Sequence, residues 1–377
     1  MRKAFKKVPE VRNSNSRGPK KKILLADCLM SGLAMFSLKS KSLLEFDQKR
    51  SDKMVKHNLK SLYKIQQAPC DTYMREQLDE VDPANLRECY LSAFKAVQRG
   101  KLLRQYDFLG GYLALLDGTE IFSSKEVHCE NCCEKKHRDG STTYHHQILG
   151  AAIAHPDLKQ VIPLCPEQIC KQDGAKKNDC ERRATQRFLQ QLKKEHPRLQ
   201  LTIVSDALSA NTPQINEIKS FGYHFITNVK PKGNKALFDF ISGIELSEKK
   251  ITIEKEHYIL RYINNIPLNN NKEAPMVNFL ECVVTKGKKP KKTFTWITNH
   301  KITKNNVYSI MRGGHARWKI ENKTFNTLKN QGYQFGHNFG HGKKHLTSVF
   351  SMLKKQLAVC FRQPYRRDIL AEHFGKK

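Results

Sequence analysis

The sequence predicts an α/β protein with a helical N-terminal domain and a β-rich insertion. Between about residues 23 and 105, apolar residues recur at three- and four-residue spacing, the period of amphipathic helices. From about 110 to 230, short apolar runs alternate with amphipathic segments, which is typical of a sheet with helices packed on it. Residues 243–300 then contain strand-like stretches separated by turn residues.

The first 105 residues are expected to form a basic arm and a helical DNA-binding domain. The arm, 1–22, contains Ser, Asn and Pro among its basic residues, and we expect it to be disordered until bound. The apolar run 23–38 contains Asp27 and is too short to span a bilayer, so it predicts a buried helix. Asp71 and Asp82 are expected to cap helices, the latter with a proline at the first helical position.

The rest of the chain divides into a core in two parts around the insertion. In the first part, 106–242, we expect strands at 110–120, 142–155, 160–166, 199–208 and 223–230 and helices at 181–196 and 213–222. The inserted β-rich subdomain occupies 243–300. The second part, 301–377, contains a predicted helix at 315–333, a Gly/His-rich loop and basic C-terminal helices.

The charge of the chain indicates a polyanionic partner. Lys and Arg number 67 against 36 acidic residues, a formal net charge of +31. Such an excess repels itself in a compact fold unless a polyanion is near. No basic amphipathic helix with a clean apolar face favours a membrane surface, so nucleic acid is the expected partner. Eleven scattered cysteines without a secretory signal indicate a reducing, cytoplasmic and bacterial setting.

Three carboxylates on separate predicted elements are candidates for a metal site. Asp117 shares a face with Leu113 and Leu115 on a buried strand, and Asp206 ends another apolar strand. Glu321 lies alone among the cations of the 315–333 helix. Carboxylates on separate elements suit Mg²⁺, and two such ions can catalyse phosphodiester displacement. The alternatives are capping or turn aspartates at strand ends and an i,i+4 salt bridge at Glu321.

The order of these motifs resembles that of DDE transposases of bacterial insertion sequences, in the branch with a β-rich insertion before the catalytic glutamate. The resemblance lies in LLDGTE, PEQICKQDGAKKNDCERRA, TIVSDAL, HFITNVK and RWKIENKTFNTLKNQGYQFGHNFGHG, and it covers roughly residues 20–360. It implies a ribonuclease-H-like mixed sheet with flanking helices, and two Mg²⁺ ions, replaceable by Mn²⁺, held by the catalytic residues Asp117, Asp206 and Glu321. It also implies cutting and joining of DNA at terminal inverted repeats and in target DNA, by a homodimer on paired ends of the mobile element.

The family's glutamate helix implies further DNA contacts. It carries an aromatic residue, an arginine four residues before the glutamate and a lysine seven after it. Arg317 matches the arginine, whereas Gly314 stands at the aromatic position with Trp318 nearby. Leu328 stands at the lysine position and Lys329 follows one residue later, about 100° further around an α-helix. The expected DNA-binding residues are Arg317, Lys329, Lys230 and Lys323. The alternatives to a transposase are a nuclease of this fold without strand transfer and an inactive DNA-binding descendant.

Three further features carry expectations of their own. Cys129 and Cys132 have the spacing of half a structural Zn²⁺ site. Candidates for the other half are His137, His145, His146, Cys165, Cys170 and Cys180. The favoured alternative is a cluster of reduced thiols in a hairpin. Glu181 is expected to be a first-turn acid after an N-cap at Asp179, the alternative being a fourth active-site carboxylate. The loop with His337, His341 and His345 is expected to be a plain surface loop. The alternatives are contact with phosphate or DNA and, less favoured, metal binding.

Overall fold

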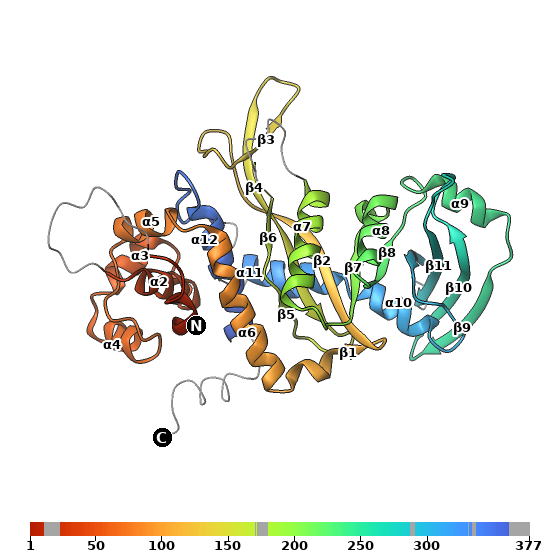
Figure 1. The fold of residues 1–377 in the computed structure, drawn as a ribbon, viewed down its shortest axis with the longest axis horizontal. Coiled ribbons are helices and arrows are strands. Elements are labelled where there is room, and N and C mark those ends of the chain that lie inside the picture. The colour runs from red at the N-terminus through yellow and green to blue at the C-terminus, as the bar shows by residue number, and fades with distance from the viewer. Residues whose placement is uncertain are drawn as a thin grey trace.

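The computed structural model describes residues 1–10, 23–169, 171, 180–286, 291–330, 332–333 and 337–361. Helices gather at one end of the molecule, a sheet with helices on both faces forms the middle, and long antiparallel strands form the other end (Figure 1). The mixed α/β class predicted from the sequence is confirmed. In the part of the chain that the structure describes, no helix has both the length and the apolar character needed to cross a bilayer.

The helical region is built around α2, which matches the buried helix predicted at 23–38. Twelve of its residues are buried, and the Asp27 carboxylate among them pairs with Arg2 and accepts from the backbone N–H of Gln66 and Gln67. The helices of this region are α1 (Arg2–Phe5), α2 (Leu25–Ser37), α3 (Leu43–Lys49), α4 (Lys53–Ser61), α5 (Asp71–Asp79), η1 (Pro83–Leu86), α6 (Arg87–Arg99) and η2 (Leu102–Tyr106).

Two expectations for this region are wrong in detail. The first ten residues are not a disordered arm, because α1 forms and buries Phe5 and Val8 in the helical core; residues 11–22 lie outside the described ones. Asp71 is the first residue of α5 rather than its cap, which is Cys70. The expected cap at Asp82 is confirmed, since its carboxylate accepts from the Ala84 N–H and Pro83 follows it.

The last described helix, α12 (Leu346–Phe361), belongs to the same helical core. Its residues Val349, Phe350 and Leu353 pack with those of α2, and Tyr90 Oη donates to the Met352 carbonyl at 2.7 Å. This helix follows the Gly/His-rich loop in sequence. The two ends of the described chain therefore share one hydrophobic core.

A single mixed sheet runs through the rest of the molecule in the order β3-β4-β2-β7-β8-β12-β11-β10-β9. Strands β2, β7 and β8 are parallel to one another, and all other pairs are antiparallel. The strands are β1 (Asp107–Phe108), β2 (Gly111–Ser124), β3 (Cys133–Lys136), β4 (Thr142–Ala154), β5 (Ile162–Pro163), β6 (Glu167–Ile169), β7 (Leu201–Ser205), β8 (His224–Asn228), β9 (Ser247–Ile253), β10 (Glu256–Pro267), β11 (Met276–Lys286) and β12 (Lys292–Thr298).

The predicted strands differ from these mainly at two places. The stretch 160–166 contains only the two-residue strand β5, because two of its residues are prolines, which lack the N–H that a ladder needs. The stretch 199–208 stops being a strand at Ser205, where Asp206 caps the short 3₁₀-helix η3 (Ala207–Ser209). The β-rich stretch 243–300 forms strands as predicted, and they extend the core sheet through the pairing of β12 with β8.

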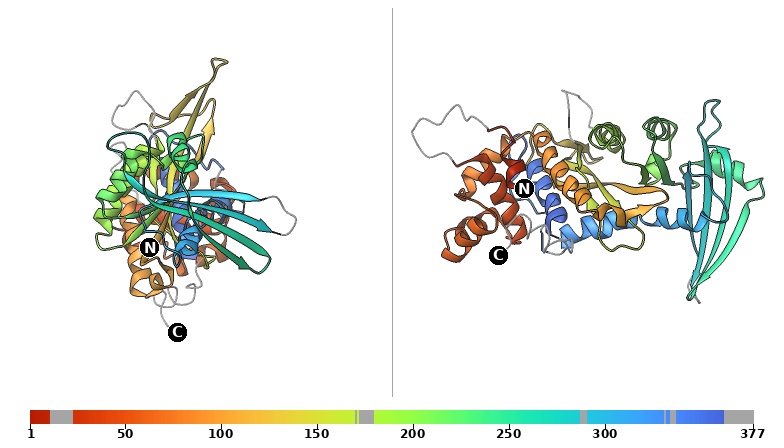
Figure 2. Two further views of the ribbon diagram at one scale, coloured as in Figure 1. Left: turned by 90° about the vertical axis from the view of Figure 1, so that its right-hand side faces the viewer. Right: turned by 60° about the horizontal axis from the view of Figure 1, so that its bottom comes forward.

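Helices cover the two faces of the central strands. On one face α7 (Glu181–Glu195) and α8 (Thr212–Ser220) pack against Leu116 and Ile203, with α9 (Lys235–Ser242) further along. On the other face lies the segment that begins with α10 (Val307–His315), drawn in blue in Figure 2. In this segment Ile320 and Phe325 pack against Leu115 and Val204. The glutamate segment therefore lies on the face to which the odd-numbered residues of β2 point.

Candidate active site

Asp117 lies on β2, and Asp206 comes directly after the parallel neighbouring strand β7. Strand β2 pairs with β7 from Tyr112 opposite Leu201 to Leu115 opposite Val204, so each aspartate follows the last paired residue of its strand by two positions. Paired residues of adjacent strands are about 5 Å apart and share a face. The Asp206 carboxylate also accepts from the Leu208 N–H at 3.0 Å, so its capping role holds as well.

Arg317 connects Glu321 to Asp117. Its Nη2 lies 2.6 Å from Glu321 Oε1 and its Nη1 donates to Asp117 Oδ1 at 3.3 Å. The i,i+4 salt bridge that the sequence suggested for Glu321 is present, but the same guanidinium also binds the strand carboxylate. One oxygen of each carboxylate engages Arg317, and the second oxygen of each remains for other ligands.

The segment that carries these residues is not the single α-helix expected over 315–333. The α-helix α10 ends at His315, a π-helix, η4 (Ile320–Phe325), contains Glu321, and α11 (Asn326–Asn330) follows. A π-helical turn spans one residue more than an α-helical turn. The eighth residue after Glu321 therefore lies on the side of the helix where an uninterrupted α-helix would have the seventh.

Lys329 occupies this eighth position and reaches strand β2. Its Nζ donates to Thr119 Oγ1 at 3.2 Å, and Thr119 follows Asp117 by two residues on the same face of β2. The one-residue offset of this lysine from the family pattern is thus compensated by the helix geometry. The sequence carried no signal for this, since nothing in the letters marks the π-helix.

Gly314 stands at the family's aromatic position because another aromatic residue fills the adjacent space. A Cβ on Gly314 would lie 2.5 Å from Nε1 of Trp296, a buried residue of β12. Trp318, the suggested substitute, is 44% exposed. Nearby, the buried Lys319 donates to the carbonyls of His155, Pro156 and Leu158 at 2.6–2.9 Å, which anchors the segment to the turn after β4.

The acids act on one another electrostatically. Burial raises the pKa of Asp117 to about 7; Arg317 opposes this shift, while Glu321, Glu181 and Asp206 add to it. Burial and the charge of Asp206 also raise the pKa of Glu181. The four carboxylates therefore act on one another, and Arg317 offsets part of this effect at Asp117 and Glu181.

Glu181 reaches the acids from α7, of which it is the first residue. The Gly118 backbone N–H donates to its carboxylate, and a Cβ at position 118 would lie 2.6 Å from Glu181 Oε2. Glu181 is the expected first-turn acid, and its carboxylate also lies against Gly118, the residue next to Asp117. The expected cap Asp179 lies outside the described residues.

The other predicted DNA-binding lysines are less defined. Lys230 is exposed, two residues after β8, the neighbour of β7 in the sheet. Lys323 lies on η4, next to the site in sequence, but its side chain is outside what the structure describes.

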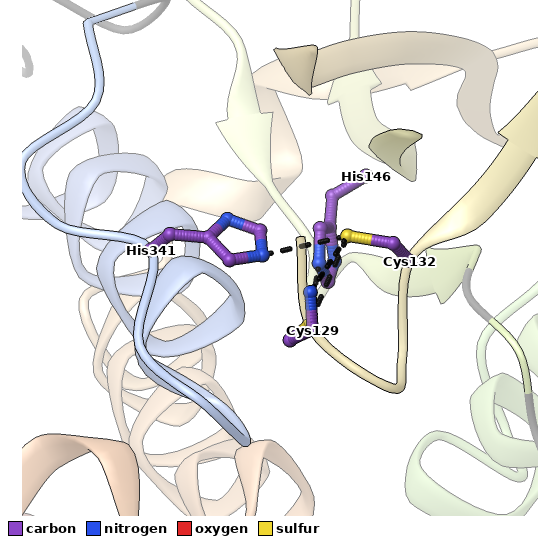
Figure 3. A group of neighbouring side chains, drawn as sticks. All are labelled: Cys129, Cys132, His146 and His341. Carbon is purple, nitrogen blue, oxygen red and sulfur yellow. Dashed lines mark hydrogen bonds between the residues drawn. The ribbon is translucent and has the colours of Figure 1, made fainter. Parts of the chain in front are cut away.

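Cys129 and Cys132 belong to a compact group with two histidines, His146 and His341, here called the Cys/His cluster (Figure 3). Their ligand atoms all lie within 4.8 Å of one another: Cys129 Sγ is 3.3 Å from His146 Nε2, Cys132 Sγ is 3.4 Å from His341 Nε2, and the two sulfurs are 3.9 Å apart. Hydrogen bonding from Cys132, then from the two imidazoles, lowers the pKa of Cys129.

One member of this cluster was expected elsewhere. His341 is 6% exposed, so its assignment to a surface loop is wrong; its loop folds back onto the turn before β3. Other candidates for the second half-site are elsewhere: His137 bonds Thr143, Cys165 is buried beside Pro166, and Cys180 is exposed. Cys170 lies outside the described residues.

The Cys/His cluster is more compact than the group of carboxylates around Asp117. Among the described residues, only the Cys/His cluster gathers the ligand atoms of three or more metal-binding side chains within 4.8 Å. Asp117, Asp206, Glu181 and Glu321 do not form such a group. No protein-family model matches this chain, and a search of curated proteins finds no match.

Proposed function

We propose that this protein is a DNA transposase that cuts and joins phosphodiester bonds with Asp117, Asp206 and Glu321. The observation that carries the proposal is that Asp117 of β2 feels the charge of Asp206, which follows the parallel neighbouring strand β7, while Arg317 links Asp117 to Glu321. Positive charge over the whole chain, a net +31, supports DNA as the substrate.

The donor set fits divalent magnesium or manganese. Carboxylate oxygens are the ligands that these hard cations prefer, and the three acids come from separate rigid elements. Burial, and then the neighbouring acids, raise the pKa of Asp117 to about 7 despite Arg317, and a divalent cation would stabilise the charged form of this group. Asp117, Asp206 and Glu321 would hold the ions, with Glu181 as an accessory acid. When bound, such ions supply Lewis-acid stabilisation of phosphodiester displacement.

The cations of the same segment position the DNA. The Arg317 guanidinium is planar and presents several N–H groups, which suits bidentate binding of a phosphate beside the acids. Lys329, held over β2 by Thr119, adds a second positive charge on the far side of Glu321. The helical region, in which α4 carries three lysines and no acidic residue, is assigned to recognition of the element ends.

A cleavage and joining assay tests this proposal. Full-length protein is incubated with Mg²⁺ or Mn²⁺ and a plasmid that carries its gene with the native flanking DNA, and both nicked and joined products are measured. We expect Asp117→Asn and Glu321→Gln to lower both products at least about 100-fold, because several kcal/mol of metal-derived stabilisation is lost. Glu120→Gln, an exposed acid of the same strand, is the matched control and should retain activity.

The outcomes separate the alternatives. Cleavage without joined product indicates a nuclease of the same fold. Absence of both products, together with absence of Mn²⁺ binding by calorimetry, indicates a DNA-binding protein without catalysis. Variants as active as the parent would refute the assignment of the three acids.

A further inference from the structure

We propose that the Cys/His cluster binds one structural Zn²⁺ ion and that this ion ties the catalytic sheet to the C-terminal loop and, through that loop, to the helical region. The inference does not depend on the transposase assignment. Its ligands are Cys129, Cys132, His146 and His341.

The spacing of the four ligand atoms fits a tetrahedral ion. With Zn–S of about 2.3 Å and Zn–N of about 2.05 Å, tetrahedral geometry places two sulfurs about 3.8 Å apart and a sulfur and a nitrogen about 3.5 Å apart. The observed separations are 3.9 Å between the sulfurs and 3.3 and 3.4 Å for the two sulfur–nitrogen pairs. A disulfide would require about 2.05 Å, so the two cysteines are not bonded to each other.

The surroundings orient the ligands. The Cys129 N–H donates to Cys132 Sγ at 3.4 Å, and the Cys132 N–H donates to the Cys129 carbonyl at 3.1 Å, which closes the turn that brings both sulfurs to one point. His341 Nδ1 lies 3.1 Å from Thr347 Oγ1, and this contact holds the ring with Nε2 toward the sulfurs. The ring of Phe122 packs 4.1 Å from that of His341 and shields the cluster.

Thiolate and imidazole together select zinc among the abundant divalent ions, since magnesium and calcium prefer oxygen. Four protein ligands complete the tetrahedron, and Cys132, His146 and His341 are all buried. An ion here leaves no position for substrate, so its role is structural. The alternative is a metal-free cluster of hydrogen-bonded thiols and imidazoles, which the experiment below excludes or establishes.

The site joins parts that are distant in sequence. Cys129 and Cys132 lie between β2 and β3, beyond the end of the strand that carries Asp117, and His146 comes from β4. His341 enters from the loop before α12, shown in blue in Figure 3. The same loop is held by Asp79 of α5, whose carboxylate accepts from four successive N–H groups, 343–346.

The test measures metal directly. Full-length protein is purified under reducing conditions without added chelator, and its zinc is determined by mass spectrometry; we expect about one Zn²⁺ per chain. Cys132→Ser and His341→Ala should lower zinc at least tenfold. The matched controls Cys180→Ser, an exposed thiol, and His345→Ala, in the same loop, should keep it.

A second measurement serves if a variant does not fold. The parent protein, loaded with Co²⁺, should show the visible absorption of tetrahedral cobalt with thiolate charge-transfer bands. His341→Cys should retain the ion and strengthen these bands, because a third thiolate joins the site. Less than about a tenth of a zinc ion per parent chain, no cobalt–thiolate bands, and Cys129 and Cys132 reacting as free thiols would overturn the proposal.

Discussion

Replacing Asp117 with asparagine should stabilise the fold while abolishing activity. The pKa of the buried Asp117 carboxyl is about 7, whereas that of an exposed aspartate is 3.8, so the folded protein disfavours the charged form. One unit of pKa corresponds to about 1.4 kcal/mol, so at a pH above 7 the charge costs the folded state up to ~4 kcal/mol. Asparagine removes the charge and keeps an oxygen that accepts from Arg317. Because the side chain retains some solvent exposure, we expect a gain of about 2–3 kcal/mol.

The sign of the pH dependence follows from proton binding. Between about pH 4 and 7 the folded protein keeps the Asp117 proton and the unfolded chain does not, so the stability of the parent falls as the pH rises through this window. Above about pH 7 the full cost is present. The advantage of Asp117→Asn over the parent should therefore be near zero at about pH 4 and reach its maximum above about pH 7.

The assay is urea unfolding of parent and variant, without Mg²⁺ or Mn²⁺, at about pH 4.5 and about pH 8. Glu120→Gln is the control for removing an acid from the same strand. Adding Mg²⁺ at pH 8 should then stabilise the parent more than the variant, since a ligand that binds only the folded state raises its stability. An advantage that is the same at both pH values, or a variant less stable than the parent at pH 8, would refute the reasoning.

Three further predictions concern residues around the site. Lys355 is fully buried, its ammonium has no hydrogen-bond partner among the described residues, and burial lowers its pKa to about 7. The free energy of unfolding of the parent should therefore rise between pH 7 and about 10.5, measured against Lys355→Met, which lacks this contribution. Gly314→Ala should cost about 1–3 kcal/mol in thermal unfolding, because the added methyl meets the Trp296 ring, whereas alanine at the exposed Gly233 should cost less than about 1. Lys329→Ala should weaken DNA binding and lower the slope of its salt dependence by about one ion, measured by fluorescence anisotropy, while Lys219→Ala, at an exposed lysine of α8, should leave both unchanged.

The elements that position the acids could be predicted from local pattern. A continuous apolar run predicts a buried strand, so the sequence indicates β2 and β7 and places Asp117 in the first and Asp206 at the end of the second. The first ten residues were mistaken for a free arm because their three buried residues are too few to show a period. Local pattern thus identifies elements long enough to repeat.

Contacts between distant segments could not be predicted in the same way. His341 and Cys132 are 209 residues apart, and no spacing rule connects them. The place of Lys329 depends on a π-helical turn, whose residues Ile320 and Phe325 pack on the sheet. Gly314 depends on Trp296 from another strand. Each of these is a property of the packed chain rather than of a short stretch of it.

The shared core of the first and last helices has a consequence for synthesis on the ribosome. Residues of α12 from Leu346 to Leu353 pack with α2, α5 and α6, so the helical region lacks part of its interior until these residues have been made. Local helices can form earlier, but their apolar faces stay exposed for most of translation. The region assigned to recognising DNA would therefore complete its fold last, after the segments that contain the two aspartates. A nascent or prematurely terminated chain would be a target for chaperones before it is a DNA-binding protein.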